Sequence, residues 1–197
     1  MNPKRRLVLA SASPRRAELL TLLGLRFEVR AADLDEEPLA GELPAATAER
    51  LARAKAEAID PGPGEALVVA ADTIVVLDGR ILGKPRDRGE AERFVSLLAG
   101  RTHEVITGLA VRACPENRIE SETAVSQVTF APMSAGEVAW YAATGEGLDK
   151  AGGYALQGKG AVFVAAVHGS YTNVIGLPLE RLYLHLKRRG LLATPRG

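Results

Sequence analysis

The sequence predicts a domain of the α/β class, because two kinds of apolar pattern alternate along it. Short apolar runs of strand length are followed by longer segments in which apolar residues recur at helical spacing. Clusters of Gly and Pro, such as Asp60–Gly64, separate these segments. The 197 residues suffice for one domain with a substantial core. We therefore expect one continuous fold over residues 1–197, without internal repeats.

The first half is expected to begin with a buried strand and a helix. Pro14 suits the first turn of that helix, and Gly24 is placed to end it. The elements expected up to residue 82 are a strand over Arg6–Ala10, the helix from Pro14, a strand over Phe27–Ala31, an acidic stretch over Asp33–Glu37, a helix from about Ala46 to Ala58, a buried strand over Leu67–Ala71 that ends at Asp72, and a hairpin of Thr73–Leu77 and Arg80–Leu82 turned by Asp78-Gly79.

The second half is expected to hold two long strands between two capped helices. Asp87 with Glu90, and Ser134 with Glu137, have the spacing of a capping box at a helix N-terminus. The expected elements are a helix after Asp87 with Ala91, Phe94, Val95 and Leu98 on its buried side, strands over Thr102–Arg112 and Ile119–Phe130, a helix from Ser134 to about Thr144, a glycine-rich segment over Gly145–Gly160, a strand over Ala161–His168 and a helix over Pro178–Arg189.

Composition excludes several classes of function. The net charge is +1 and aromatic residues make up 5%, which is unlike a protein that coats nucleic acid. Cys114 is the single cysteine, so an intrachain disulfide and a multi-cysteine zinc site are excluded. The apolar run Leu7–Ala10 is shorter than the roughly seven to fifteen residues of a secretory signal, and no segment approaches the ~18 apolar residues of a membrane span. We expect a cytoplasmic protein with no nucleic-acid or membrane partner.

The segment Ser11–Arg16 joins the first strand to the first helix and is the first candidate binding site. Unpaired backbone N–H groups and the positive end of a helix dipole favour an anion at such a position. The hydroxyls of Ser11 and Ser13 and the guanidinium groups of Arg15 and Arg16 add donors suited to phosphate oxygens. The alternative is an ordinary strand–turn–helix with surface arginines. The ligand that this pattern suggests is a phosphate.

Asp72, at the end of an apolar strand, is a candidate for the chemistry. Folds of the α/β class commonly present catalytic or binding groups at such strand ends, and a buried carboxylate is costly unless it meets a cation or a donor. Asp35, Glu36 and Glu37 also follow a strand, and could join Asp72 around a hard cation such as Mg²⁺. An aspartate that caps the turn is the alternative.

Two lysines are candidates for balancing the charge of a phosphate. Lys55 shares a helix stripe with Leu51 and Ala58, so its ammonium either faces inward or extends to water. Lys84 follows Gly79 and Gly83 in a stretch that is not a P-loop, because the glycines are one residue too close. It is a candidate phosphate ligand outside that motif.

Gln157 lies in the glycine-rich segment, where its amide would suit the edge of a nucleotide base. Glycine lets the backbone approach a ligand closely. A surface loop without a ligand is the alternative for this segment. His103, His168 and His185 lack the mutual spacing of metal ligands, so structural roles are expected for them.

Several blocks in order resemble the Maf family of nucleotide pyrophosphatases, and the match runs from about Leu7 to Leu186. Their joint occurrence makes the resemblance specific. It implies the Maf/Ham1 (ITPase-like) fold, with an elongated, mixed, curved sheet flanked by helices, two lobes around a central cleft, and a homodimer. The blocks are LASASPRR at Leu9–Arg16, ADTIV at Ala71–Val75, GKPRD at Gly83–Asp87, DKAG at Asp149–Gly152, and GSYTN at Gly169–Asn173 with GLP at Gly176–Pro178.

The resemblance also implies an activity and a site. The activity is a house-cleaning hydrolysis of nucleoside triphosphates to monophosphate and pyrophosphate, with Mg²⁺, Mn²⁺ or Co²⁺ as cofactor. Asp72 would be the general base that activates water for attack on the α-phosphorus. Glu36 would hold the metal with Asp72, and Asp35 is the alternative to Glu36. Among the remaining positions, Arg16, Lys55 and Lys84 would bind phosphate, and Arg15, Thr73 and Gln157 match positions linked to substrate choice.

The DKAG…QG form resembles the branch of the family that acts on dTTP and UTP. Ala155-Leu156 stands before Gln157 where Gly-Ile is more usual, so a preference for 7-methyl-GTP or another non-standard triphosphate is one alternative. A second alternative is a nucleotide-sensing regulator, because the family has been connected with inhibition of septum formation. Asp72 and the acidic stretch disfavour a pure binder, since carboxylates are costly beside phosphates unless they hold a metal.

Overall fold

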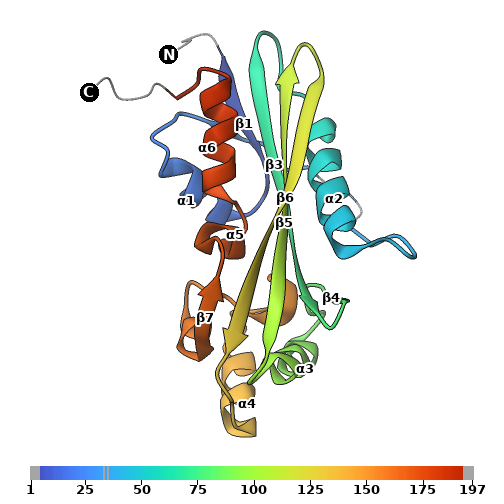
Figure 1. The fold of residues 1–197 in the computed structure, drawn as a ribbon, viewed down its shortest axis with the longest axis vertical. Coiled ribbons are helices and arrows are strands. Elements are labelled where there is room, and N and C mark those ends of the chain that lie inside the picture. Colours follow the sequence, from blue (N-terminus) through green and yellow to red (C-terminus); the bar gives the residue numbers. More distant parts are fainter. Residues whose placement is uncertain (1–4, 33, 35, 193–197) are drawn as a thin grey trace. The chain divides into compact units, whose positions relative to one another are not determined.

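A computed structural model describes residues 5–32, 34 and 36–192 (Figure 1). Within these residues, seven strands form a mixed sheet in the hydrogen-bonded order β2-β1-β3-β5-β6-β7, and β4 pairs with β3. The α/β class predicted from the sequence is thus confirmed. The chain divides into two compact units, which we describe separately. Unit 1 comprises Met1–Asp72, Thr107–Ala124 and Gly176–Gly197, and unit 2 comprises Thr73–Ile106 and Val125–Ile175.

Three strands contribute residues to both units. They are β3 (Ala66–Leu77), β5 (Thr102–Cys114) and β6 (Arg118–Phe130). The other elements of unit 1 are β1 (Arg6–Ala10), α1 (Pro14–Thr21), β2 (Glu28–Val29), α2 (Pro44–Ala58) and α6 (Leu179–Arg188). Those of unit 2 are β4 (Arg80–Leu82), α3 (Arg88–Leu98), α4 (Ala135–Ala143), two short 3₁₀ helices η1 (Ala151–Gly153) and η2 (Lys159–Phe163), β7 (Val164–His168) and α5 (Tyr171–Ile175).

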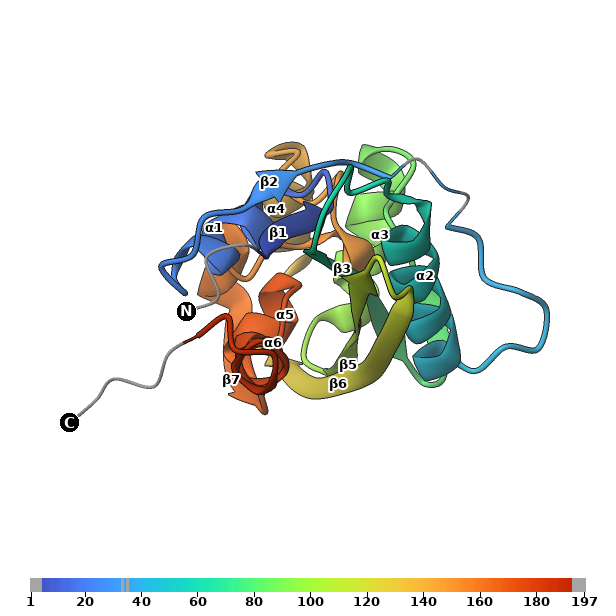
Figure 2. The same ribbon diagram turned by 90° about the horizontal axis from the view of Figure 1, so that it is seen from above.

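One cluster in the core of unit 1 consists mainly of alanine and valine side chains, which lets α2 lie close to the sheet. β1 pairs in parallel with both β2 and β3, and its residues from Leu7 to Ala10 are buried. Ala52 and Ala56 of α2 are fully buried in this core. Gly108 of β5 allows α2 to approach closely, because a Cβ added there would lie 2.7 Å from the backbone nitrogen of Glu49. Figures 1 and 2 show α2 on the opposite side of the unit 1 strands from α1 and α6.

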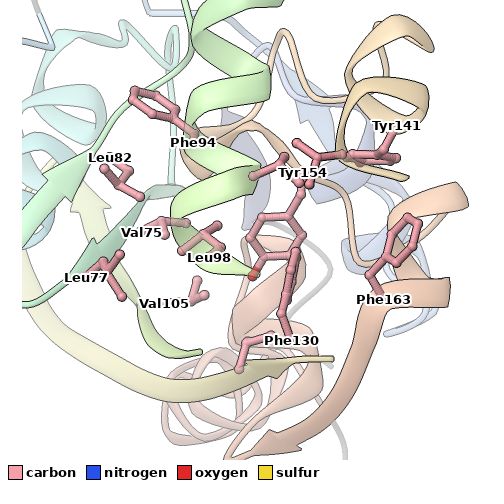
Figure 3. Close-up of a cluster of buried hydrophobic side chains, with 13 residues drawn as sticks. Val75, Leu77, Leu82, Phe94, Leu98, Val105, Phe130, Tyr141, Tyr154 and Phe163 are labelled. Carbon is pink, nitrogen blue, oxygen red and sulfur yellow. The ribbon is translucent and has the colours of Figure 1, made fainter. Parts of the chain in front are cut away.

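Unit 2 has an aromatic core, shown in Figure 3. The rings of Phe130 and Tyr154 meet edge to face, with their centroids 4.8 Å apart. The hydroxyl of Tyr154 lies 2.8 Å from Nε2 of the buried His103, which gives this histidine a structural role. Phe94 and Leu98 on the buried side of α3 complete the cluster, as their helical spacing predicted.

The main difference from the predicted elements concerns Asp72. A strand ending at this residue was expected, with a separate hairpin strand after it, but β3 continues without a break from Ala66 to Leu77. Its pairing changes instead. The parallel register with β1 ends at Ala70, and the antiparallel register with β4 begins at Val75. Asp72 lies between the two, so it still follows the carboxyl end of a parallel pair.

Smaller differences concern the bounds of single elements. Strand β2 is shorter than expected, and α2 begins at Pro44. Ala58 is exposed, and Ala52 and Ala56 share the buried side of α2 with Leu51 and Lys55. The expected last strand begins as η2, and α5 was not predicted.

The two predicted capping boxes also differ from one another. Ser134 and Glu137 form the complete reciprocal box at the start of α4. Asp87 accepts a hydrogen bond from the backbone of Glu90, but the carboxylate of Glu90 accepts from the backbone of Arg86 instead. Among the described residues, no helix is long and apolar enough to cross a membrane.

Candidate active site

The turn between β1 and α1 has the local structure expected of an anion site. Ser13 is the N-cap of α1 and Pro14 occupies the first turn, but the Ser13 side chain does not cap the helix. Ser11 is buried, and its hydroxyl accepts hydrogen bonds from the Ser13 backbone at 3.1 Å and from the Arg16 guanidinium at 3.3 Å. The N-terminal end of α1 therefore faces a turn lined with hydroxyl and guanidinium donors.

Arg16 is held in this turn by a residue far along the chain. Its Nε donates to the backbone carbonyl of Gly176 at 2.8 Å. Burial lowers the pKa of the Arg16 guanidinium, Asp72 and Glu36 act to raise it, and Arg15 acts to lower it. The charges of Asp72, Glu36 and Arg15 therefore all act on the Arg16 guanidinium.

Lys55 forms ion pairs with both Asp72 and Glu36. Its ammonium lies 2.5 Å from Oδ1 of Asp72 and 2.5 Å from Oε1 of Glu36. Only 8% of the Lys55 side chain and 9% of the Asp72 side chain are exposed, whereas Glu36 is 41% exposed. Of the two orientations considered for Lys55, the inward one is therefore correct. Burial of this pair is possible because each charge has an opposite partner.

The carboxylates of Glu36 and Asp72 form a donor set that fits a small divalent cation. Both approach the same ammonium, so the contacting oxygens are no more than about 5 Å apart. Two oxygen ligands of Mg²⁺ are at most about 4.2 Å apart, because each Mg–O bond is about 2.1 Å long. A shift of about 1 Å would let both oxygens contact one ion once the Lys55 ammonium, which contacts both of them in this structure, moves aside.

The remaining ligands of such an ion would come from elsewhere. Among the described residues, no group of three or more Asp, Glu, His or Cys side chains is placed to hold a metal. A site of two carboxylates is typical of Mg²⁺ that takes its other ligands from water and substrate phosphate. Asp35, the alternative to Glu36, lies outside the described residues.

The other three predicted site residues belong to unit 2. Thr73 follows Asp72 on β3 and is half-buried, whereas Lys84 and Gln157 are exposed. The backbone of Gly152 in η1 donates to the carbonyl of Gly83 at 3.0 Å, which ties the DKAG block to the residue before Lys84. Gln157 lies farther along, in the loop between η1 and η2.

The GSYTN block has a structural role that its sequence left open. The Asn173 side chain is fully buried and donates to the Val105 carbonyl of β5 at 3.0 Å and to the Ser126 hydroxyl of β6 at 2.9 Å. The same hydroxyl accepts from the Ser170 backbone. The block therefore holds the turn after β7 against two strands of unit 2.

Two contributors were missed by the sequence analysis. The Gly176 carbonyl that orients Arg16 belongs to the GLP block, which gave the only signal for it. Glu146 accepts hydrogen bonds from the backbone of Lys159 and Gly160, near Gln157. Glu146 lies in a turn, and no motif or spacing in the sequence indicates a functional role for it.

Comparison with known proteins identifies the family. The model of the family described as Maf-like protein matches residues 6–189, so the chain belongs to this family. The dTTP/UTP pyrophosphatase of Myxococcus xanthus is 52% identical over 185 residues, which cover 94% of this chain and 93% of that protein. The protein of the same name from Syntrophomonas wolfei is 47% identical and is covered over 96% of its length, with 92% of this chain matched.

Among solved structures, the Ham1 protein of Staphylococcus aureus is similar, with a TM-score of 0.45 and 16% identity. The match covers 65% of this chain and 72% of that one.

Proposed function

We propose that this chain hydrolyses dTTP and UTP to the nucleoside monophosphate and pyrophosphate. The observation that carries the proposal is the ion-paired group of Asp72, Lys55 and Glu36, in which Asp72 and Lys55 are buried. The charges of Asp72 and Glu36 also act on Arg16 at the start of α1. Two relatives matched over more than nine tenths of this chain bear the name dTTP/UTP pyrophosphatase. A triphosphate needs both the basic groups and the carboxylates of such a site.

In this proposal the turn before α1 binds phosphate. Backbone N–H groups of α1, the hydroxyls of Ser11 and Ser13 and the guanidinium of Arg16 supply donors to the phosphate oxygens. Because Gly176 and Ser11 hold the guanidinium in place before substrate arrives, little ordering of this side chain is required on binding. Lys84 supplies a further positive charge to the phosphates.

Asp72 is the proposed general base. Its carboxylate accepts a proton from water while the water oxygen forms a bond to the α-phosphorus, and the bond from that phosphorus to the bridging oxygen breaks. Pyrophosphate leaves and the monophosphate remains. The ammonium of Lys55 balances the negative charge that Asp72, Glu36 and the substrate bring together.

The carboxylates of Glu36 and Asp72 would hold the divalent cation, which would be Mg²⁺, Mn²⁺ or Co²⁺. When bound, such an ion lowers the pKa of coordinated water and offsets phosphate charge. Arg15, Thr73 and Gln157 are the residues proposed to select the base. The chain is also proposed to form a homodimer. Light scattering of the purified protein tests this, and the expected mass is twice 20.9 kDa.

Hydrolysis in water labelled with ¹⁸O tests the proposed bond cleavage. Attack on the α-phosphorus places the label in the monophosphate, whereas attack on the β-phosphorus places it in pyrophosphate. Asp72→Asn should still bind dTTP but lose at least about 10²-fold in turnover, since it removes the base. Asp78→Asn is the matched control, because Asp78 is exposed and pairs with Arg101. Label in pyrophosphate, or full activity of Asp72→Asn, would contradict the proposal.

A further inference from the structure

A single carboxylate organises the loop that carries Gln157. Glu146 follows α4, and its Oε1 accepts a hydrogen bond from the backbone of Lys159 at 2.9 Å. Its Oε2 accepts from the backbone of Gly160 at 3.0 Å and from the Tyr141 hydroxyl at 2.9 Å. Burial raises the pKa of Glu146, but these donors outweigh burial and hold the pKa below its ordinary value. The loop therefore closes on a charged acceptor.

Tyr141 attaches the other end of the loop to the same carboxylate. Its hydroxyl donates to Glu146 and accepts from the backbone of Ala155 at 3.0 Å. The side chain is 1% exposed and belongs to the aromatic core of unit 2 (Figure 3). The Tyr141–Glu146 pair thus holds the backbone on both sides of Gln157, whose own side chain is exposed.

Two glycines after Gln157 let the loop approach this pair closely. Gly158 has a φ of +147°, and a Cβ added there would lie 2.8 Å from Cδ of Glu146. A Cβ on Gly160 would lie 2.8 Å from the Tyr141 hydroxyl oxygen. Neither position accepts a side chain without moving the loop away from its anchor. The loop conformation is consequently specified by backbone contacts to one polar pair.

Rigidity of this loop matters for the choice between pyrimidines. Uracil and thymine present an N3–H donor beside carbonyl acceptors, whereas cytosine presents an N3 acceptor beside an amino donor. A glutamine amide matches either pattern if it turns over, because it carries one acceptor and one donor group. Selection of one pattern therefore requires a fixed position of the amide against the base edge, so that the wrong base leaves polar groups unpaired. The backbone that carries Gln157 sets that position.

We propose that Glu146, acting with Tyr141 through the loop Ala155–Gly160, is a positioning residue for pyrimidine selection by Gln157. The inference rests on the proposed function, in which Gln157 contacts the base. It adds a residue that touches neither substrate nor metal. Its action is to keep the Gln157 backbone fixed, so its loss should change discrimination between bases more than the chemical step.

The test compares Glu146→Gln with Glu137→Gln, which makes the same chemical change in the capping box of α4, the helix that precedes Glu146. For Glu146→Gln we expect KM for dTTP to rise about tenfold, with kcat within about twofold. The preference for dTTP over dCTP should fall about tenfold. Hydrogen exchange of a peptide covering Ala155–Gly160 should quicken, because two backbone N–H groups lose a charged acceptor. Glu137→Gln should change none of these.

A double-mutant cycle separates positioning from a general structural effect. In a Gln157→Ala background, Glu146→Gln should leave the dTTP to dCTP ratio unchanged, because the side chain that it positions is gone. Tyr141→Phe removes only the hydroxyl and should shift the ratio in the same direction, which provides a second variant if Glu146→Gln does not fold.

Three results would overturn the inference. These are an unchanged ratio in Glu146→Gln, a loss of kcat alone, and a fall in the ratio that persists without the Gln157 side chain. Each of them leaves the proposed function intact, since wild type would still hydrolyse dTTP and UTP. If wild type hydrolyses neither, the proposed function fails, and the inference fails with it because it concerns the base of that substrate.

Discussion

Gly108→Ala is expected to impair catalysis although residue 108 lies outside the proposed site. The added Cβ would lie 2.7 Å from the Glu49 nitrogen and nearer still to the Ala48 carbonyl, and ordinary contact begins at 3.4 Å. Both obstacles are backbone atoms of α2, so no rotamer change relieves the clash. The helix must move from β5 by about 1 Å, at a cost of about 1–3 kcal/mol in unfolding free energy.

That movement would be transmitted to Lys55, which lies about two turns farther along α2. Its ammonium is 2.5 Å from each of two carboxylates, a geometry that a 1 Å displacement would break. A displacement of about 1 Å in a catalytic group typically lowers the rate by about 10²-fold. We therefore expect kcat for dTTP to fall by about that factor.

The assay is steady-state hydrolysis of dTTP at a temperature well below the melting temperature of the variant. Circular dichroism should show that Gly108→Ala is folded. Gly136→Ala is the matched control, since nothing lies within 4 Å of its added Cβ, and it should retain wild-type kcat. A folded Gly108→Ala variant with wild-type kcat would refute the reasoning that close packing of α2 on β5 positions Lys55.

Three further predictions concern charges. Lys55→Met should lower the unfolding free energy in urea by about 3 kcal/mol, because it leaves buried Asp72 unpaired, and adding Asp72→Asn should restore most of it; no recovery would contradict the pairing. Burial lowers the pKa of His103 from 6.5 to about 4. Between pH 6.5 and pH 4, His103 therefore binds a proton in the unfolded chain but not in the folded one. Stability should therefore fall by about 3 kcal/mol as pH drops from 6.5 to 4, and equilibrium unfolding of His103→Gln should show a smaller dependence; equal slopes would exclude His103 as the cause. Lys84→Ala should raise KM for dTTP about tenfold without unfolding the chain, and an unchanged KM would remove Lys84 from the phosphate site.

Periodicity predicted most of the strands and helices, because the buried face of each leaves an apolar pattern in the sequence. The apolar strand Leu7–Ala10 and the helix faces around Phe94 and Leu98 are in the core as expected. The continuity of β3 through Asp72 was not predictable in the same way. A charged residue interrupts an apolar pattern, yet Lys55 compensates that charge from α2, and such a partner cannot be seen from strand spacing.

Some features of the candidate site could be predicted from the sequence, and others could not. Local chemistry indicated the donors of Ser11–Arg16, since all lie within one turn. The partner that orients Arg16 is the Gly176 carbonyl, 160 residues away, and a backbone group carries no sequence signal. Glu146 is similar, because its partners are backbone N–H groups of another loop. Contacts of this kind depend on tertiary structure rather than on residue type.

The most direct test of the central claim is a substrate panel with separation of products. Purified chain would be incubated with dTTP, UTP, CTP, dATP, dGTP, 7-methyl-GTP and ITP, each with Mg²⁺, Mn²⁺ or Co²⁺ and with EDTA as control. The account predicts selective conversion of dTTP and UTP to monophosphate and pyrophosphate, abolished by EDTA. Release of single phosphates, or tight binding without turnover across the panel, would contradict it and favour a nucleotide-sensing regulator.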